Sequence, residues 1–155
     1  MGLISGNFIK HYSSSVGKNL MHVCFKAKYC HPVFDDARVR GRCGEIIRET
    51  AVRYGMEIRE MGFDRDHVHL TVDAGPNHSP ASMAKALKGN SGHTILREFP
   101  QLKRRYFWGS GLWSPAYYFD SMGDRTSDEI DEYVRNQGKP KRKADAKQVT
   151  LADFA

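Results

Sequence analysis

Residues 64–72, Asp-Arg-Asp-His-Val-His-Leu-Thr-Val, form the stretch that decides the fold. Their apolar and polar side chains alternate, which predicts a β-strand that buries one face and displays the other. The displayed face carries His67 and His69. Residues two apart in a strand lie about 6.6 Å from each other, so both imidazoles are able to reach one cation. The same pattern also fits a half-buried strand that merely carries histidines, and the rest of the chain must separate the two interpretations.

The composition is that of one soluble globular domain. Of the 155 residues, 40% are hydrophobic and 27% are charged, and the formal net charge is +6. This charge favours a polyanionic partner. The sequence has no apolar run of about 18 residues and no signal-peptide pattern, so we expect no membrane span and no secretion. Cys24, Cys30 and Cys43 lack metal-type spacing and are expected to be free thiols in a reducing cytoplasm.

The other strands are predicted from alternation and from turn residues. Residues 21–29 alternate up to the break at Pro32, and residues 56–61 precede a turn at Gly62. Residues 106–120 are rich in aromatic side chains and are typical of two strands around a Gly-Ser-Gly turn. The buried face of the first strand is expected to carry Val23, Phe25, Ala27 and Tyr29.

Three helices are predicted from capping residues, over residues 35–54, 79–99 and 126–137. Asp35 or Asp36 caps the start of the first helix and Gly55 suits its C-terminal end. Ser79-Pro80 starts the second helix, which Gly89 and Gly92 are expected to weaken. The buried stripe of the first helix is expected to consist of Val39, Cys43, Ile46, Ile47, Thr50 and Tyr54. The order strand–helix–strand–strand–helix–strand, with a last helix, predicts a two-layer α+β fold with an antiparallel sheet, of the ferredoxin-like (RRM-like) kind.

The last predicted helix carries Tyr133 and Gln137, which are four residues apart and therefore share a face. A tyrosine phenol is a competent nucleophile once it is activated, because its ordinary pKa is about 10. A glutamine amide oxygen is a hard ligand for a divalent cation. His67, His69 and Gln137 together provide three ligands for a cation that polarises a phosphodiester for attack. Apolar residues flank Tyr133, so a purely structural role in docking the helix is the alternative.

Segments 66–70 and 133–137, Asp-His-Val-His-Leu and Tyr-Val-Arg-Asn-Gln, resemble those of TnpA-type single-tyrosine HUH transposases, the enzymes of insertion sequences that move as single-stranded DNA. Shorter matches lie at residues 28–29, 32–34, 88–91 and 112–115. The resemblance spans about residues 22–138. It divides the chain into a leader (1–20), an HUH catalytic domain (21–138) and a basic tail (139–155). The chain departs from the family pattern at Cys30-His31, where basic residues are expected.

This resemblance implies a specific reaction. Such enzymes bind hairpins at insertion-sequence ends and cleave and rejoin single-stranded DNA through a 5′-phosphotyrosine, here on Tyr133. They use Mg²⁺ or Mn²⁺ and no nucleotide cofactor. They act as homodimers in which the histidine pair of one subunit faces the tyrosine helix of the other. A cytoplasmic protein that joins the nucleoid when DNA-bound is expected.

Basic residues gather on and after the second long helix, and aromatic residues follow them. The candidate DNA contacts are Lys85, Lys88, Arg97, Lys103, Arg104 and Arg105. Cations neutralise phosphates and aromatic rings stack on unpaired bases. A solvated helix face is the alternative for each of these residues.

Other functions fit the sequence less well. A histidine-triad hydrolase needs a third histidine where Thr71 stands, and a two-histidine phosphoesterase needs a second strand motif, for which His11-Tyr12-Ser13 has no strand pattern. A non-enzymatic RNA- or single-stranded-DNA-binding module explains the charge but not Tyr133 beside Gln137. A domesticated HUH nuclease that acts on chromosomal palindromes keeps the same chemistry and stays open.

Overall fold

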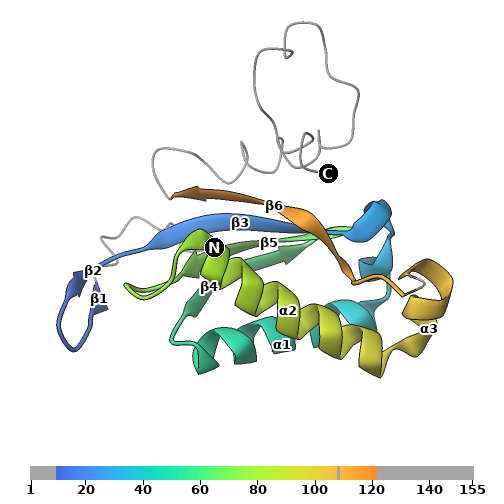
Figure 1. The fold of residues 1–155 in the computed structure, drawn as a ribbon, viewed down its shortest axis with the longest axis horizontal. Coiled ribbons are helices and arrows are strands. Elements are labelled where there is room, and N and C mark those ends of the chain that lie inside the picture. The colour runs from blue at the N-terminus through green and yellow to red at the C-terminus, as the bar shows by residue number, and fades with distance from the viewer. Residues whose placement is uncertain (1–9, 108, 122–155) are drawn as a thin grey trace, which may run out of the picture.

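The computed structural model describes residues 10–107 and 109–121. Its centre is a four-stranded antiparallel sheet in the order β4-β5-β3-β6, with two long helices on one face (Figure 1). The elements are β3 (Leu20–Ala27), α1 (Ala37–Arg53), β4 (Glu57–Phe63), β5 (His67–Asp73), α2 (Pro80–Glu98) and β6 (Trp113–Ser121). The first and third of these strands lie in the middle, which is the ferredoxin-like arrangement, so the predicted α+β fold is confirmed.

Strand β5 has the predicted alternation. Val68, Leu70 and Val72 are at most 1% exposed and face the helices. In the register of the sheet, Val68 lies between Phe25 of β3 and Phe63 of β4. The core therefore forms between the helices and one face of the sheet, and His67 and His69 are left on the opposite face.

Helix α1 begins at the predicted cap, since the Asp36 side chain accepts a hydrogen bond from the backbone amide of Arg38. Five residues of its predicted stripe are buried: Val39, Cys43, Ile46, Ile47 and Thr50. Tyr54 is 46% exposed, so its predicted burial is wrong. The helix ends at Arg53, and Tyr54 is already its C-cap. Gly55 follows with a φ of 74°, which the predicted capping glycine adopts without strain.

Helix α2 begins at the predicted Ser79-Pro80 signal. Its Gly92 was expected to weaken the helix, and the structure gives it a role. A Cβ at Gly92 would lie 3.2 Å from Cδ1 of Trp113, and the Trp113 indole donates to the Ser91 hydroxyl at 2.9 Å. The small residues of α2 therefore let β6 pack closely against the helix.

The first predicted strand is shorter than expected. Strand β3 ends at Ala27, and residues Lys28–Cys30 form a 3₁₀ turn (η1). Tyr29 has a φ of 61° and is 69% exposed, so its predicted place on the buried face is wrong. The left-handed turn ends the alternation before Tyr29.

The aromatic region 106–120 forms one strand, so the prediction of two strands is wrong. A short helix α3 (Pro100–Leu102) and a π-helical turn η3 (Lys103–Phe107) continue from α2. Tyr106 and Phe107 pack on the ring of His31, with ring centroids 4.5 and 5.5 Å away. Their aromatic character serves packing of this turn and not a strand ladder.

Gly62 was predicted in a turn, but it lies within β4 opposite His69. The leader contains a short hairpin, β1 (Lys10–His11) and β2 (Val16–Gly17). After the hairpin, the Asn19 amide donates to the backbone carbonyl oxygens of Gly75 and His78 at 2.8 and 3.2 Å. A second 3₁₀ turn, η2 (Val33–Asp35), precedes α1.

All three cysteines are free thiols, as predicted. None of the helices in the described ranges is both long and apolar enough to cross a membrane. The predicted helix 126–137 and the basic tail lie outside the described residues.

Candidate functional site

The two histidines of β5 stand side by side on the face of the sheet opposite α1 and α2. Their ring centroids are 6.1 Å apart and the rings are nearly perpendicular. His67 is opposite Lys26 of β3, and His69 lies between Cys24 of β3 and Gly62 of β4. The strand thus holds the two imidazoles at a separation that one cation is able to bridge.

A hydrogen bond to Asp66 orients the His67 ring. Nδ1 of His67 lies 2.9 Å from Oδ1 of Asp66, and this bond is the main cause that lowers the pKa of the Asp66 carboxyl. An ionised carboxylate only accepts, so Nδ1–H donates, and in the neutral imidazole the lone pair that a cation needs is then on Nε2. Nε2 points to the side where Oδ2 of Asp64 lies 4.0 Å away. The carboxylates of Asp66 and Asp64 therefore lie on the two nitrogen sides of the His67 imidazole, which was predicted as a metal ligand.

The donor set fits a divalent cation in part. The nearby carboxylate oxygens suit Mn²⁺ or Mg²⁺, and the two imidazoles suit Mn²⁺ better than Mg²⁺. Among the described residues, no group of three or more His, Cys, Asp or Glu side chains is placed to hold a metal ion. A complete site thus needs a further ligand, and the predicted one, Gln137, lies outside the described residues. The predicted nucleophile, Tyr133, lies outside them as well.

The rest of this face is also polar. The hydroxyl of Thr71 lies 3.2 Å from Nδ1 of His22, which is its partner across β3. Asp73 is 2% exposed and lies 3.8 Å from the guanidinium of Arg59. Thr71 is thus part of a paired polar row and does not supply a third ligand of the histidine-triad kind.

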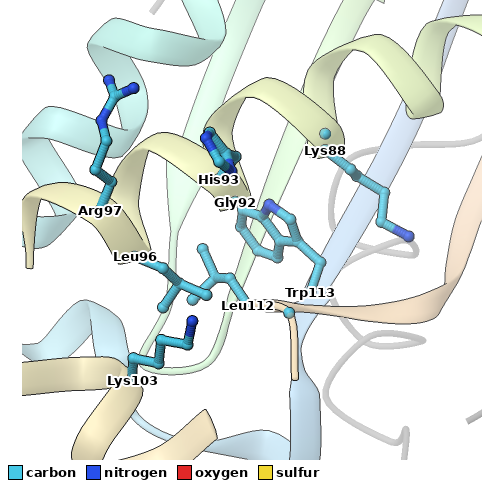
Figure 2. A pocket seen from close by; sticks show the side chains of 10 residues that line it. Lys88, Gly92, His93, Leu96, Arg97, Lys103, Leu112 and Trp113 are labelled. Carbon is cyan, nitrogen blue, oxygen red and sulfur yellow. The ribbon is translucent and has the colours of Figure 1, made fainter. Parts of the chain in front are cut away.

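Three of the six predicted DNA-contacting residues line a cavity beside α2. A cavity of about 580 Å³ lies between α2 and the segment before β6, and Lys88, Arg97 and Lys103 are among its lining residues. Figure 2 shows Lys103 extending toward Leu112, whereas Arg97 points away from it. Leu96, Leu112 and Trp113 contribute apolar surface to the same cavity. The structure therefore combines cations and apolar side chains on one side of α2.

Lys88 has internal partners. Its ammonium donates to the backbone carbonyl oxygens of Ser114 and Pro115 at 2.7 and 3.1 Å, and it lies 5.3 Å from the centre of the Tyr117 ring. Burial lowers the pKa of the Lys88 amine. An ammonium group has three donors, so one remains for another acceptor. Lys88 thus links α2 to β6, a role that the sequence did not reveal.

The other predicted DNA contacts are exposed. Lys85 and Arg97 lie on α2, and residues 103–105 form the exposed part of η3. The Arg105 guanidinium lies 5.0 Å from the centre of the Tyr106 ring. Lys85 is not among the residues that line the cavity.

Asp66 was missed as a functional residue. It was quoted only as part of the segment 66–70 and was given no role, although a carboxylate beside a metal-binding histidine is a common pairing. That adjacency was the available signal.

A ferredoxin-like sheet that displays a histidine pair from a central strand is the architecture of HUH nucleases. The chain belongs to the IS200-like transposase family, a family of DNA-cleaving enzymes, since the family model matches residues 15–137. The ISDra2 transposase TnpA of Deinococcus radiodurans is 34% identical over 116 residues, which cover 75% of this chain and 81% of that protein. The transposase for insertion sequence element IS200 of Salmonella typhimurium is 29% identical, with 75% and 74% covered.

Two solved structures resemble the fold. One is the crystal structure of a candidate transposase from Deinococcus radiodurans R1, with a TM-score of 0.71 and 33% identity, covering 82% of this chain and 96% of that one. The other is a REP-associated tyrosine transposase bound to a REP hairpin, with a TM-score of 0.52 and 13% identity, covering 82% and 72%. At 13% identity, this second structure supports only the assignment of the fold.

The Asp66–His67 hydrogen bond generates a prediction. Asp66→Ala should lower the affinity for Mn²⁺ by about 10- to 100-fold, because the His67 ring loses the partner that fixes its orientation and tautomer. Isothermal titration with Mn²⁺ measures the change. Glu49→Ala is the control, since it removes an equal charge from the exposed face of α1. Equal affinities of the two variants would contradict the role of Asp66.

Proposed function

We propose that this chain is a transposase that binds hairpins at the ends of its insertion sequence and cleaves and rejoins single-stranded DNA beside them, with Tyr133 as the nucleophile. The observation that carries the proposal is the oriented histidine pair on the face of the sheet opposite α1 and α2. Membership of the transposase family supports the substrate class. The spacing of Tyr133 and Gln137 supports their action at the same site.

Cleavage is a transesterification. The Tyr133 oxygen attacks the scissile phosphorus, the bond from phosphorus to the 3′ oxygen breaks, and the departing oxygen takes up a proton as a 3′-hydroxyl. The phenol proton passes to solvent or to a nearby base. Rejoining reverses these steps with a 3′-hydroxyl as attacker, so no nucleotide is hydrolysed.

The chain's own residues prepare this step. His67, His69 and Gln137 would hold a Mg²⁺ or Mn²⁺ ion, which supplies Lewis-acid polarisation of the phosphate when bound. The Asp66 carboxylate keeps the proton of His67 on Nδ1 and so keeps Nε2 available. The strand backbone holds both imidazoles, so their orientation is set before substrate arrives.

DNA binding is assigned to the cationic side of α2 and η3. Residues 103–105 are exposed and follow α2 after the short helix α3, and the adjacent cavity combines Lys88, Arg97 and Lys103 with apolar side chains. Phosphates are expected at the cations, and unpaired bases at the apolar surface. A solved protein of the same fold is bound to a REP hairpin, which makes a DNA hairpin the appropriate probe.

The first test concerns the nucleophile. Tyr133→Phe should bind a hairpin from its own locus normally but form no covalent adduct with the adjoining single strand, because the attacking oxygen is gone. Denaturing gel electrophoresis of protein with labelled DNA and Mn²⁺ detects the adduct. Tyr54→Phe, at the exposed end of α1, is the matched control. A covalent adduct formed by Tyr133→Phe would assign the nucleophile to another tyrosine. If the unaltered protein forms no covalent adduct, a non-enzymatic binding module would be favoured.

The second test concerns the DNA surface. Replacing Lys-Arg-Arg at 103–105 with three alanines should weaken hairpin binding and reduce the slope of log affinity against log salt by about 2 to 3, because each lost phosphate contact removes about 0.7 to 0.9. Fluorescence anisotropy at several salt concentrations measures the slope. Alanines at Lys18, Arg48 and Arg53 remove the same charge elsewhere and serve as the control. A slope equal to that of the control would place the DNA on another surface.

The third test concerns assembly. We propose a homodimer in which the histidine pair of one subunit acts with Tyr133 of the other. A heterodimer of a Tyr133→Phe chain and a His67→Ala chain then contains one intact site and one doubly defective site, and should cleave at about half the unaltered rate. Tandem affinity tags provide the heterodimer for a single-strand cleavage assay. If each subunit uses its own tyrosine, both sites are defective and no cleavage is observed.

A further inference from the structure

The imidazole of His69 occupies the space of a missing side chain. Gly62 is its direct partner on β4, and a Cβ added to Gly62 would overlap Nε2 of His69 and lie 2.7 Å from its Cδ2. Heavy atoms that are not bonded do not approach so closely. The ring therefore lies over the backbone of β4, in a position that any other residue at 62 would block.

The sheet explains why the ring leans to this side. Neighbouring strands are about 4.8 Å apart, so side chains on one face normally crowd their partners across the strands. On the β3 side of His69 the partner is Cys24, which is 2% exposed and already packed. On the β4 side the partner has no side chain.

The backbone gives no other reason for glycine at this position. Gly55, Gly75 and Gly109 have φ values of 74°, 70° and 79°, which favour glycine, whereas the φ of Gly62 lies outside that left-handed region. Its position inside β4 is open to any residue with strand geometry. The room for the imidazole is thus the feature that depends on glycine.

Both Nε2 atoms lie near the end of β4. Nε2 of His67 lies 4.0 Å from Oδ2 of Asp64, the residue that follows β4, and Nε2 of His69 lies over Gly62 within that strand. The position of the His69 ring over Gly62 thus contributes to bringing the two donor atoms to the same end of the strand.

We propose that Gly62 is a positioning residue for the metal site: the absence of its side chain fixes the His69 ring beside that of His67. This inference rests on the metal-binding part of the proposed function. A methyl group at 62 would push the tip of the imidazole aside. Because that tip is able to rotate, the fold is expected to survive while the paired arrangement of donor atoms is lost.

The test compares Gly62→Ala with Gly41→Ala, since a Cβ at Gly41 meets nothing within 4 Å. Gly62→Ala should bind Mn²⁺ about 10- to 100-fold more weakly, the size of effect seen when ligand orientation is lost. It should also move the imidazole ¹H–¹⁵N NMR signals of His69 in metal-free protein. In the His69→Ala background, Gly62→Ala should cause no further loss of affinity, because both changes act on the same group.

A melting experiment covers the case in which Gly62→Ala folds poorly. Any loss of melting temperature caused by Gly62→Ala should disappear when His69→Ala removes the blocked ring. A double variant that melts as low as Gly62→Ala alone would overturn the proposal, because the methyl group would then clash with something else.

The outcomes separate the inference from the proposed function. If His67→Ala and His69→Ala both bind Mn²⁺ like the unaltered protein, the metal-binding part of the proposed function fails, and this inference fails with it. If both lose affinity while Gly62→Ala keeps it and leaves the His69 signals in place, only the inference about Gly62 fails. The inference would also be overturned if the losses of Mn²⁺ affinity caused by Gly62→Ala and His69→Ala added in full in the double variant.

Discussion

The structure depends on the two-sided pairing of strand β5. Its backbone is paired with β3 on one side and β4 on the other, and Val68, Leu70 and Val72 anchor it in the core. A slip of one residue would turn the histidines toward the hydrophobic core and these apolar side chains toward the polar face. Burial of three side chains at about 1.5–3 kcal/mol each opposes such a slip, so the hydrophobic core keeps the histidine pair on the face opposite the helices.

The two faces of the sheet are divided between stability and chemistry. The helices cover one face, so polar groups collect on the other, where the Asp66–His67 bond and the row of His22 and Thr71 satisfy one another. The cationic side of α2 is tied to this sheet through β6, since Lys88 and Ser91 both contact that strand. The proposed DNA surface and the histidine pair are thus connected through the same sheet.

The net charge of +6 does not by itself locate a DNA surface. Several arginines lie beside carboxylates within the fold: Arg42 is 2.8 Å from Glu98, Arg65 is 3.1 Å from Asp35, and Arg38 is 3.0 Å from Asp36. Such exposed pairs contribute little to stability, but they neutralise the local field. The distribution of charge around α2 and η3 therefore carries more information than the total.

The sequence by itself determined the features that follow from local periodicity and capping. The alternation in β5, the caps at Asp36 and Ser79, and the stripe of α1 each depend on residues within a few positions, so the order of elements and the ferredoxin-like fold were predictable. Contacts across the sheet and between layers were decided only by the tertiary structure. Gly62 meets His69 through the pairing of β4 with β5, and Lys88 finds carbonyl oxygens 26 and 27 residues away. A local pattern contains the residue types of such pairs but not their register, because register depends on how the whole sheet and its helices pack together.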